Sequence, residues 1–498
     1  MTRGSSVSST WYDAVVVGAG FGGLATALEL TRRGARVALC ETLNYPGGCA
    51  STFRREGHAF EAGATLFSGF EPHQLFGRWI REHGMPVTVD WLDPVVELRT
   101  PDLRLPVHRD KARFIESLCA LPGAPVDGIR RLFALQAQVA EALWPLFDDP
   151  TLLPPLNVRA LLRHSGRALQ YAPLLRWMGR PLGSVLEKLG LMGFAPLRTY
   201  LDALCQITVQ CSAAEAEAPF ALAAMDYYWR GTGHVRGGIG KLAEAMAHAV
   251  EARGGTVLLA NRVKSITQVP GGWSVASRKG ELRARNVVAN LLPRGVLRLL
   301  GMTVDQLPGL GAMSERIAEG WGAAMLYLVV KAPEHESGSA HHLELVRDTR
   351  APFIEGNHLF MSISGAADEG RAPEGHRTVT VSTHVPLKTL AHLPAAEQGA
   401  YLSGIQTRMH QGLEQLAPEW MAGLTHTMTA SPRTYQRFTQ REGGAVGGVP
   451  RRAGLDNYRN LGPVQVMDGL WLVGDSVFPG QSTLATAVGG VRTAARIT

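Results

Sequence analysis

The chain has 498 residues, a length that favours about two to four domains. Apolar residues make up 45% and charged residues 19%, which is a globular composition, and the net charge of +7 is only mildly basic. Zinc-finger spacing, an RNA-binding aromatic signature and long basic runs are absent from the sequence, so we expect no nucleic-acid partner.

The first elements predict a nucleotide-binding unit. Residues 1–10 are small and polar and are expected to be disordered. A short apolar strand over 13–17 leads through a glycine turn at 18–23 into a helix over 24–33, and a second strand follows over 36–41. This strand–helix–strand unit is typical of a doubly wound sheet. Because the first apolar run leads directly into the turn, it does not indicate a secretory signal.

The middle of the chain alternates between helical and sheet-forming character. Residues 73–230 are predicted to be mainly helical, with a proline-rich break at 152–156. Further predicted elements are a helix over 236–253 behind the glycines 237–240, strands within 256–275 that turn at Gly271–Gly272, a buried strand over 287–291, sheet strands over 320–331 and 377–385, and loops over 334–341 and 366–376.

The last segment repeats the pattern of an apolar strand followed by a glycine. A strand over 470–473 precedes Gly474 and Asp475. We expect a closing helix over 485–497, entered through Gly489 and Gly490.

The glycines of the first turn carry a binding motif. Gly18, Gly20 and Gly23 form G-x-G-x-x-G between a strand and a helix. The first makes the turn, the second lets backbone approach a pyrophosphate, and the third lets helix and strand pack closely. Glu41 lies at the end of the next strand, where an acidic group accepts hydrogen bonds from an adenosine ribose. The sequence therefore predicts a dinucleotide cofactor.

Other glycines favour FAD over NAD. Gly48, in Pro46–Gly47–Gly48, follows the second strand, and a basic residue just beyond it, Arg54 or Arg55, suits the phosphates. Asp475 is placed to meet the ribityl or pyrophosphate oxygens of an extended FAD. A helix entered at Gly490 would direct its positive end toward the flavin edge that gains charge on reduction.

Cysteine usage and hydropathy narrow the class further. The five cysteines are scattered and form no C-x-x-C pair, so they indicate neither a metal site nor a redox dithiol. They suit a reducing compartment. No apolar stretch reaches the length of about 18 residues that a spanning helix needs. We expect a cytoplasmic protein that associates peripherally with a membrane.

Three blocks of the sequence resemble the phytoene desaturase and carotenoid isomerase family of FAD-dependent oxidoreductases. They are VVVGAGFGGLATALELTRRGARVALCETLNYPGGCASTF (Val15–Phe53), HVRGGIGKLAEAMAHAVEARGGTVLLANRVKSI (His234–Ile266) and WLVGDSVFPGQSTLATAVGGVRTA (Trp471–Ala494). The stretch Gly47–Pro72 is most similar to the carotenoid 3,4-desaturase branch. Residues 73–230 and 295–450 match only in general character.

The resemblance implies an FAD enzyme that acts on long polyene hydrocarbons at a membrane surface. It implies that Val263 touches the adenine side of FAD and that Thr65 lies near the isoalloxazine. The residues expected to bind FAD are Gly18, Gly20, Gly23, Glu41, Gly48, Arg55, Thr65, Val263, Gly474, Asp475 and Gly490.

We expect an α/β fold with two lobes. One is a doubly wound, Rossmann-like FAD-binding domain, and the other is a mixed α+β substrate domain with a helical membrane-facing part. The predicted division is FAD-binding segments over 10–72, 231–294 and 456–498, a helical segment over 73–230 and a substrate-domain sheet over 295–455.

The expected reaction is desaturation of a carotenoid, at the 3,4 position of an acyclic end. A C–C bond loses a hydride to flavin N5 and a proton elsewhere, so the protein must mainly hold the bond and exclude water. No residue stands out as the base. Asp226, Tyr228, His234 and Arg236 precede or enter a glycine-rich turn and are candidates, although a structural role is favoured for each.

One segment suits a membrane surface. Between Arg159 and Leu182 basic residues alternate with apolar ones, and no acidic residue occurs. Solvated arginines on ordinary surface helices explain the pattern equally well. The arginines are Arg159, Arg163, Arg167, Arg176 and Arg180, and the apolar residues include Leu161, Leu162, Leu169, Leu174, Leu175, Trp177 and Met178.

Several further classes of protein share the glycine motif. A carotenoid cis–trans isomerase that uses reduced FAD is not separated from a desaturase by any residue, and retinol-saturating enzymes are similar as well. An amine or protoporphyrinogen oxidase is a second possibility. A non-catalytic prenyl-lipid-binding protein of related fold is a third, and the intact glycines and Glu41 argue against it.

Overall fold

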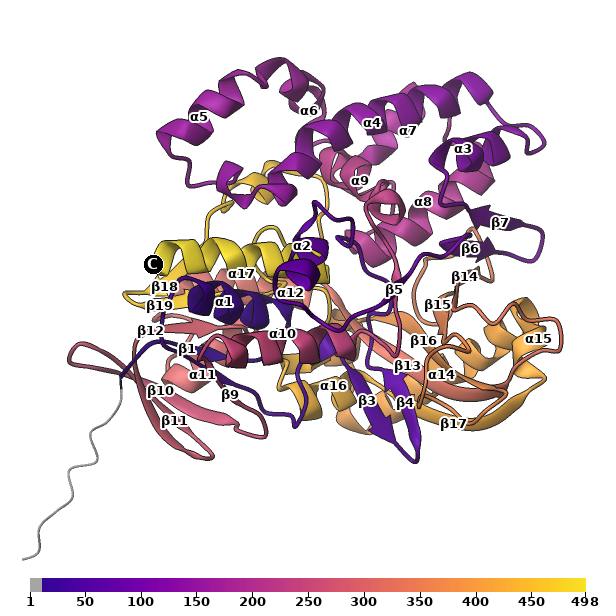
Figure 1. The fold of residues 1–498 in the computed structure, drawn as a ribbon. Helices are drawn as coiled ribbons and strands as arrows, with labels where there is room; N and C mark the ends of the chain where they lie inside the picture. The colour runs from indigo at the N-terminus through magenta and orange to yellow at the C-terminus, as the bar shows by residue number, and fades with distance from the viewer. Residues whose placement is uncertain (1–10) are drawn as a thin grey trace, which may run out of the picture.

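An eight-stranded sheet, assembled from three separated parts of the chain, forms one half of the molecule (Figure 1). The computed structural model describes residues 11–498, so the expected disorder of 1–10 lies outside the described residues. β1 pairs in parallel with β2 and β12, β2 pairs in parallel with β9, and β12 pairs in parallel with β19. The strands are β1 (Trp11–Val17), β2 (Val37–Cys40), β9 (Thr256–Leu258), β10 (Val263–Val269), β11 (Gly272–Ser277), β12 (Gly280–Ala289), β18 (Val464–Met467) and β19 (Leu470–Leu472).

Both faces of this sheet are covered. Ala14 and Val16 of β1 face a core shared with three helices, while Val15 and Val17 face a second core that includes two others. This is the predicted doubly wound arrangement, and it explains why the strand is a continuous apolar run. The helices are α1 (Phe21–Arg32), α10 (Gly240–Ala252) and α17 (Thr483–Ile497) on the first face and α11 (Pro293–Leu300) and α12 (Pro308–Ala318) on the second.

Helix α17 begins earlier than the sequence suggested. Its N-cap is Ser482, whose hydroxyl accepts a hydrogen bond from the Ala485 N–H. The expectation that Gly489 and Gly490 open the helix is therefore wrong. A Cβ at Gly490 would lie only 2.4 Å from the Gly22 carbonyl oxygen, so this glycine lets α17 pack closely against α1.

A seven-stranded sheet forms the other half, in the order β17-β13-β16-β15-β14-β6-β7. Helix α14 (Ala395–Leu416) packs its apolar face against it. The predicted strands over 320–331 and 377–385 are confirmed as β13 and β16. The strands are β6 (Val96–Arg99), β7 (Arg104–Val107), β13 (Trp321–Lys331), β14 (His341–Val346), β15 (His358–Ile363), β16 (His376–Pro386) and β17 (Leu424–Ala430). Shorter helices nearby are α13 (Leu387–His392), α15 (Pro418–Met421) and α16 (Pro432–Thr439).

A helical part lies above both sheets (Figure 1). Residues of α4 spaced three or four apart, such as Ile129, Leu132 and Phe133, enter its core. The helices are α3 (Lys111–Cys119), α4 (Val126–Asp148), α5 (Val158–Ser165), α6 (Ala172–Trp177), α7 (Leu182–Lys188), α8 (Ala195–Thr208) and α9 (Ala218–Ala224). Helix α2 (Leu75–Glu82) packs instead into the core that contains α1, α10 and α17. Within residues 11–498, no helix is both long enough and apolar enough to cross a bilayer.

The helical prediction for 73–230 is wrong for three short strands. β6 and β7 join the seven-stranded sheet through β14, and β5 (Val89–Asp90) pairs with β8 (His234–Val235). β3 (Thr52–Arg55) and β4 (His58–Glu61) form a separate hairpin. We propose that the five predicted segments describe the domain organisation, with 96–107 transferred to the substrate-domain sheet.

Candidate functional site

A cavity of about 1070 Å³ lies where the two sheets and the helical part meet. It exceeds the range of about 300–1,000 Å³ that is usual for pockets of drug-sized ligands. One end is lined by the glycine turn after β1, and the other by Leu156 and Leu175 of the helical part. The cavity therefore has room for a long cofactor and a further apolar ligand.

The glycine turn has the geometry of an anion-binding loop. Gly18 has φ +99°, and a Cβ there would lie 2.8 Å from the Asn290 carbonyl oxygen. A Cβ at Gly23 would lie 2.0 Å from the Gly18 carbonyl oxygen, so Gly23 permits the predicted close packing of α1 on β1. Gly20 is the N-cap of α1 and offers no side-chain cap. The first N–H groups of α1 are thus free to bind phosphate oxygens.

Glu41 follows β2 at the same end of the cavity. Its Oε2 accepts a hydrogen bond from the Ala19 N–H at 2.8 Å and its Oε1 accepts one from the Leu43 N–H at 2.8 Å. Burial raises the pKa of Glu41, and these N–H groups offset only part of the rise. Val263 also lines the cavity, and its contact with the adenine side of FAD stays a prediction. A buried carboxyl group with remaining acceptor capacity suits the hydroxyls of a ribose.

The middle of the cavity is formed by two glycine-containing turns. Gly48 (φ +61°) and Thr65 line one side, and Gly474 (φ +113°) lines another. The Thr65 hydroxyl is buried and has no hydrogen-bond partner in the part of the chain that the structure describes. A buried hydroxyl that faces a cavity without a partner is expected to bond a ligand.

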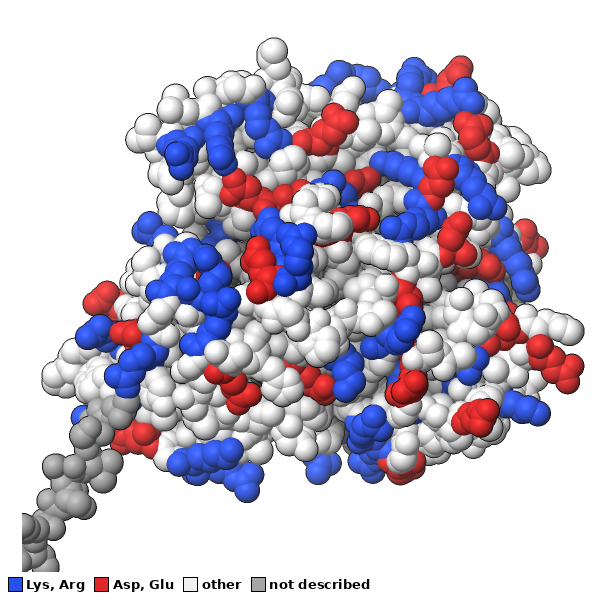
Figure 2. Space-filling view, viewed as in Figure 1, with Lys and Arg blue, Asp and Glu red and all other residues white. Residues whose placement is uncertain are grey.

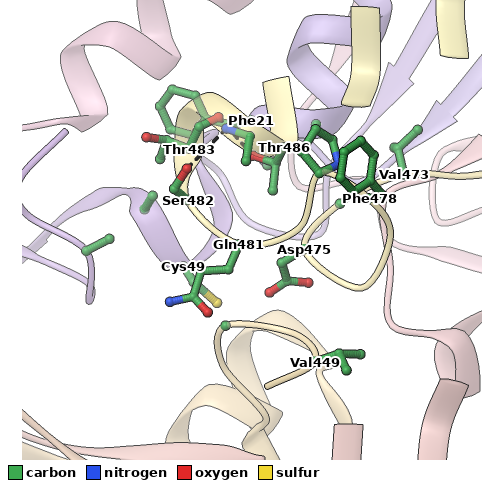
Figure 3. Close-up of a pocket in the computed structure, with 18 of the residues that line it drawn as sticks. Phe21, Cys49, Val449, Val473, Asp475, Phe478, Gln481, Ser482, Thr483 and Thr486 are labelled. Atoms are coloured by element: carbon green, nitrogen blue, oxygen red, sulfur yellow. Dashed lines mark hydrogen bonds between the residues drawn. The ribbon is translucent and has the colours of Figure 1, made fainter. Parts of the chain in front are cut away.

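Asp475 faces the same open space as Cys49 and Gln481 (Figure 3). Its Oδ2 accepts a hydrogen bond from the Arg441 guanidinium at 2.6 Å. Burial alone lowers the pKa of Arg441, but the neighbouring Asp475 charge raises it above its usual value. This pair holds one carboxylate oxygen in place and leaves the other, Oδ1, without a hydrogen-bond partner among the described residues.

Three residues predicted to bind FAD do not line the cavity. Gly23 and Gly490 serve helix packing against β1 and α1. The Arg55 side chain is 59% exposed and lies 3.4 Å from the Glu56 carboxylate. It lies on β3, and its neighbour Arg54 donates to the Gly370 carbonyl, so neither side chain reaches the cavity. The predicted residues that do line it are Gly18, Gly20, Glu41, Gly48, Thr65, Val263, Gly474 and Asp475.

The four catalytic candidates also lie outside the cavity lining, and each has a protein partner. Asp226 pairs with Lys111 at 2.8 Å, and the Tyr228 hydroxyl donates to Glu344 at 3.1 Å. These contacts agree with the structural role that is favoured for Asp226 and Tyr228.

The remaining two catalytic candidates, His234 and Arg236, are each paired with an aspartate near β5 and β8. His234 Nε2 lies 2.9 Å from Asp368 Oδ2, and both side chains are buried. Arg236 pairs with Asp90 at 2.6 Å in a more exposed position.

Asp368→Asn is expected to lower the free energy of unfolding by about 2 kcal/mol at neutral pH. Burial alone would raise the Asp368 pKa, but the hydrogen bond and charge of His234 and the charge of Arg371 lower it to about 2, from an ordinary 3.8. Because the folded-state pKa is the lower one, this stability is present above about pH 4 and is lost as the pH falls toward 2.

Urea unfolding of wild type and variant between about pH 2 and 7 measures this effect. Asp90→Asn, which breaks the more exposed pair with Arg236, serves as the control and is expected to change little. Equal effects of the two substitutions would contradict the buried-pair account.

Several lining residues were missed by the sequence analysis. Arg441, Arg451 and Gln481 lie in irregular segments, where no periodicity marks a side chain as inward-facing. His384 is different, because it lies on β16 two residues after Ser382, and both residues line the cavity. Its place in a predicted strand was a usable signal, although alternation alone would not have selected it, because Thr383 also lines the cavity. Burial lowers the pKa of His384 to about 3, so its imidazole is neutral at physiological pH.

The glycine turn, the open α1 N-terminus, Glu41 and the unpaired Thr65 hydroxyl fit an extended flavin dinucleotide. Two solved structures share this fold. An oxidoreductase from Methanosarcina mazei is 16% identical with a TM-score of 0.63, over 96% of this chain and 99% of its own. Putrescine oxidase bound to putrescine is 15% identical with a TM-score of 0.62, over 98% and 99%. The protein is an FAD-dependent oxidoreductase.

The chain belongs to the family described as flavin containing amine oxidoreductase, which matches residues 21–497. Prolycopene isomerase of Arabidopsis thaliana is 26% identical over 98% of this chain and 82% of that protein. A lycopene-forming phytoene desaturase of a Paracoccus species is 24% identical over 97% and 96%. Human all-trans-retinol 13,14-reductase is 24% identical over 94% and 82%. These relatives confirm the predicted resemblance to carotenoid desaturases and isomerases.

Proposed function

We propose that the protein desaturates a carotenoid, at the 3,4 bond of an acyclic end. The observation that carries this proposal is the apolar lining of the cavity beyond the glycine turn. From the predicted flavin end it continues between apolar side chains of the helical part to the molecular surface. The apolar lining includes Leu143, Phe147, Leu152, Leu153, Leu174, Ile207, Phe220 and Ala223. An apolar lining that includes surface-exposed Leu156 and Leu175 suits a long polyene.

The chemistry asks little of individual side chains. FAD, when bound, supplies a hydride acceptor. The C–C bond loses a hydride and a proton as it becomes a double bond, so the protein must position the bond and exclude water. Neutral His384 and the apolar walls provide such a setting. We assign no residue as the base.

A cis–trans isomerase is the second candidate. It is supported by the prolycopene isomerases, which match 98% of this chain at about a quarter identity. Such a reaction would need the same cofactor cradle and the same polyene passage. It leaves the mass of the carotenoid unchanged, whereas desaturation removes two hydrogen atoms.

The experiment is incubation of FAD-loaded protein with lycopene-type and hydroxylated acyclic carotenoids in liposomes. Chromatography with absorption and mass spectra identifies the products. A red-shifted product lighter by two hydrogen atoms supports desaturation and shows which end is oxidised. An unchanged mass with an altered cis band replaces the proposal with isomerisation. No change in any acyclic carotenoid would refute both.

An amine or protoporphyrinogen oxidase and a non-catalytic lipid-binding protein are distinguished by simple tests. Turnover of amines or protoporphyrinogen by the same preparation would favour an oxidase of that kind. A purified chain that binds polyene but shows no flavin spectrum would favour a lipid-binding protein.

We further propose that the α5–α6 region contacts a membrane surface. We call Leu156, Val158, Leu161, Leu162, Leu169 and Leu175 the α5–α6 patch; their exposed fractions range from 37% for Leu156 to 91% for Leu169. Basic side chains gather around α5 in Figure 2, and Arg159, Arg163 and Arg167 lie in this segment. Because Leu156 and Leu175 also line the cavity, a carotenoid leaving a bilayer here would enter without crossing water.

A further inference from the structure

The guanidinium of Arg451 faces the cavity without a carboxylate partner. The Arg451 N–H donates to the Val209 carbonyl at 2.9 Å, which fixes the backbone beside the end of α8. Its Nη2 makes a long hydrogen bond of 3.3 Å to the Pro479 carbonyl, and the cation lies 5.1 Å from the Phe220 ring centre. Among the described residues, no acidic oxygen lies within 4.0 Å. Its other nitrogens make no hydrogen bond within residues 11–498 and are not sealed by protein atoms.

The nearest acid does not neutralise this charge. Glu217 Oε1 accepts hydrogen bonds from the Gly179 N–H and the Tyr458 hydroxyl, and its Oε2 accepts one from the Phe220 N–H. Burial raises the pKa of Glu217, and among the described residues its carboxyl group forms no ion pair with Arg451 within 4.0 Å. Burial lowers the pKa of Arg451 to about 10, which is still well above neutral pH. Arg451 is therefore a cation whose environment stabilises it poorly.

Two other arginines near the cavity make several hydrogen bonds to the protein. Arg441 binds the Asp475 carboxylate and the Ala445 carbonyl. Arg492 donates to the carbonyls of Pro154, Leu461 and Phe478. Their guanidinium groups hold segments of the chain together. Arg451 differs, because it lines the cavity and its side chain makes a single long hydrogen bond among the described residues.

A second polar side chain without a hydrogen-bond partner among the residues that the structure describes follows Val209, whose carbonyl accepts the Arg451 N–H. Gln210 follows Val209, lines the cavity and is only 2% exposed, and its Oε1 has no hydrogen-bond partner in the described part of the chain. A Cβ at Gly447 would lie 1.6 Å from the Gln210 amide nitrogen, so glycine at that position makes room for this amide. Two unpaired polar groups in an apolar cavity indicate a ligand with a polar end.

We propose that Arg451 binds an acceptor oxygen on the end group of the polyene substrate, and that Gln210 Oε1 accepts a hydrogen bond where that end group is a hydroxyl. This inference rests on the proposed function and narrows its substrate class to polyenes with a hydroxyl, carbonyl or carboxylate end. A guanidinium only donates hydrogen bonds, so a hydrocarbon end leaves it unpaired. A carboxylate binds most strongly, because both partners are charged.

The test uses three polyenes of one chain length that end in methyl, hydroxymethyl or carboxylate. Their dissociation constants for FAD-loaded protein are measured in detergent micelles by quenching of tryptophan fluorescence. Comparing wild type with Arg451→Met for each ligand cancels differences in partitioning. We expect the variant to bind the carboxylate at least about tenfold more weakly and the methyl-ended polyene less than about twofold more weakly.

Two further variants refine the result. Arg451→Lys keeps the charge and is expected to retain most of the preference for the carboxylate. Arg452→Met is the matched control, because that neighbouring side chain is 43% exposed and lies 3.9 Å from Glu215. It is expected to change none of the three affinities.

The outcomes separate the subsite from the proposed function. Equal weakening of all three polyenes by Arg451→Met refutes the subsite and leaves the proposed function standing. Loss of FAD or a shifted flavin spectrum in Arg451→Met, with ligand preference unchanged, shows that the guanidinium contacts the cofactor and also refutes it. If none of the polyenes binds FAD-loaded wild type, the proposed function and the subsite both fail.

Discussion

Gly18→Ala is expected to deprive the protein of FAD and to lower its thermal midpoint. Gly18 has φ +99°, which costs a residue with a side chain about 1–2 kcal/mol. The added Cβ would also lie 2.8 Å from the Asn290 carbonyl oxygen, and backbone cannot move away as a side chain does. The turn must therefore shift, and α1 no longer presents its N–H groups to the pyrophosphate. We expect FAD affinity to fall at least about tenfold, or about 1.4 kcal/mol.

Gly34→Ala is the matched control for this substitution. Gly34 follows α1 at its other end and has φ +85°, but a Cβ there meets nothing within 4 Å. It is therefore expected to share the conformational cost and to keep FAD. Flavin absorbance per protein after gel filtration and thermal unfolding with added FAD measure both effects. Similar FAD content in the two variants would contradict the assigned role of Gly18.

The cofactor cradle was largely predictable because its signals are local. Gly18, Gly20 and Glu41 lie within one strand–helix–strand unit, where spacing along the chain fixes spacing in the fold. Gly474 and Asp475 were found in the same way, from a glycine after a short apolar strand. The error at Gly490 arose because a glycine pair resembled a helix entry, whereas the Ser482 cap starts α17 earlier.

Long-range pairing and inward orientation were not predictable from local pattern. β6 joins the second sheet through β14, and their residues Leu98 and Glu344 are paired across the chain without any local signal. Arg451 resembles any surface arginine in sequence, next to Arg452. Only the packing of α8 and α9 around Arg451 makes its side chain line the cavity, whereas the Arg452 side chain is exposed.

Leu161→Gln/Leu162→Gln/Leu169→Gln is expected to abolish binding to vesicles while leaving the fold unchanged. These side chains are 54%, 69% and 91% exposed and do not line the cavity. Exposed substitutions change stability by about 0.5 kcal/mol or less. A leucine moved fully from water into an apolar phase contributes about 1.5–3 kcal/mol. Partial insertion of three predicts binding to anionic vesicles at least about a hundredfold weaker than wild type.

Co-sedimentation with vesicles measures this effect, and Val304→Gln/Phe438→Gln is the control. Those two residues are 43% and 45% exposed and belong to the α11–α12 loop and α16. Wild-type binding should also weaken with salt, because each arginine near an anionic surface contributes about 1 kcal/mol that ions screen. Vesicle binding by the triple variant equal to wild type would refute the α5–α6 patch as the membrane contact.

Activity measurements test whether the substrate passes from the α5–α6 patch into the cavity. If a carotenoid enters from the bilayer beside Leu156 and Leu175, the triple leucine variant should lose activity on carotenoid in liposomes and keep it on carotenoid dispersed in detergent. A variant impaired equally in both would place the defect within the cavity. Retained activity in both would show that the substrate reaches the cavity without membrane contact at α5–α6, and that the exposed leucines serve another partner.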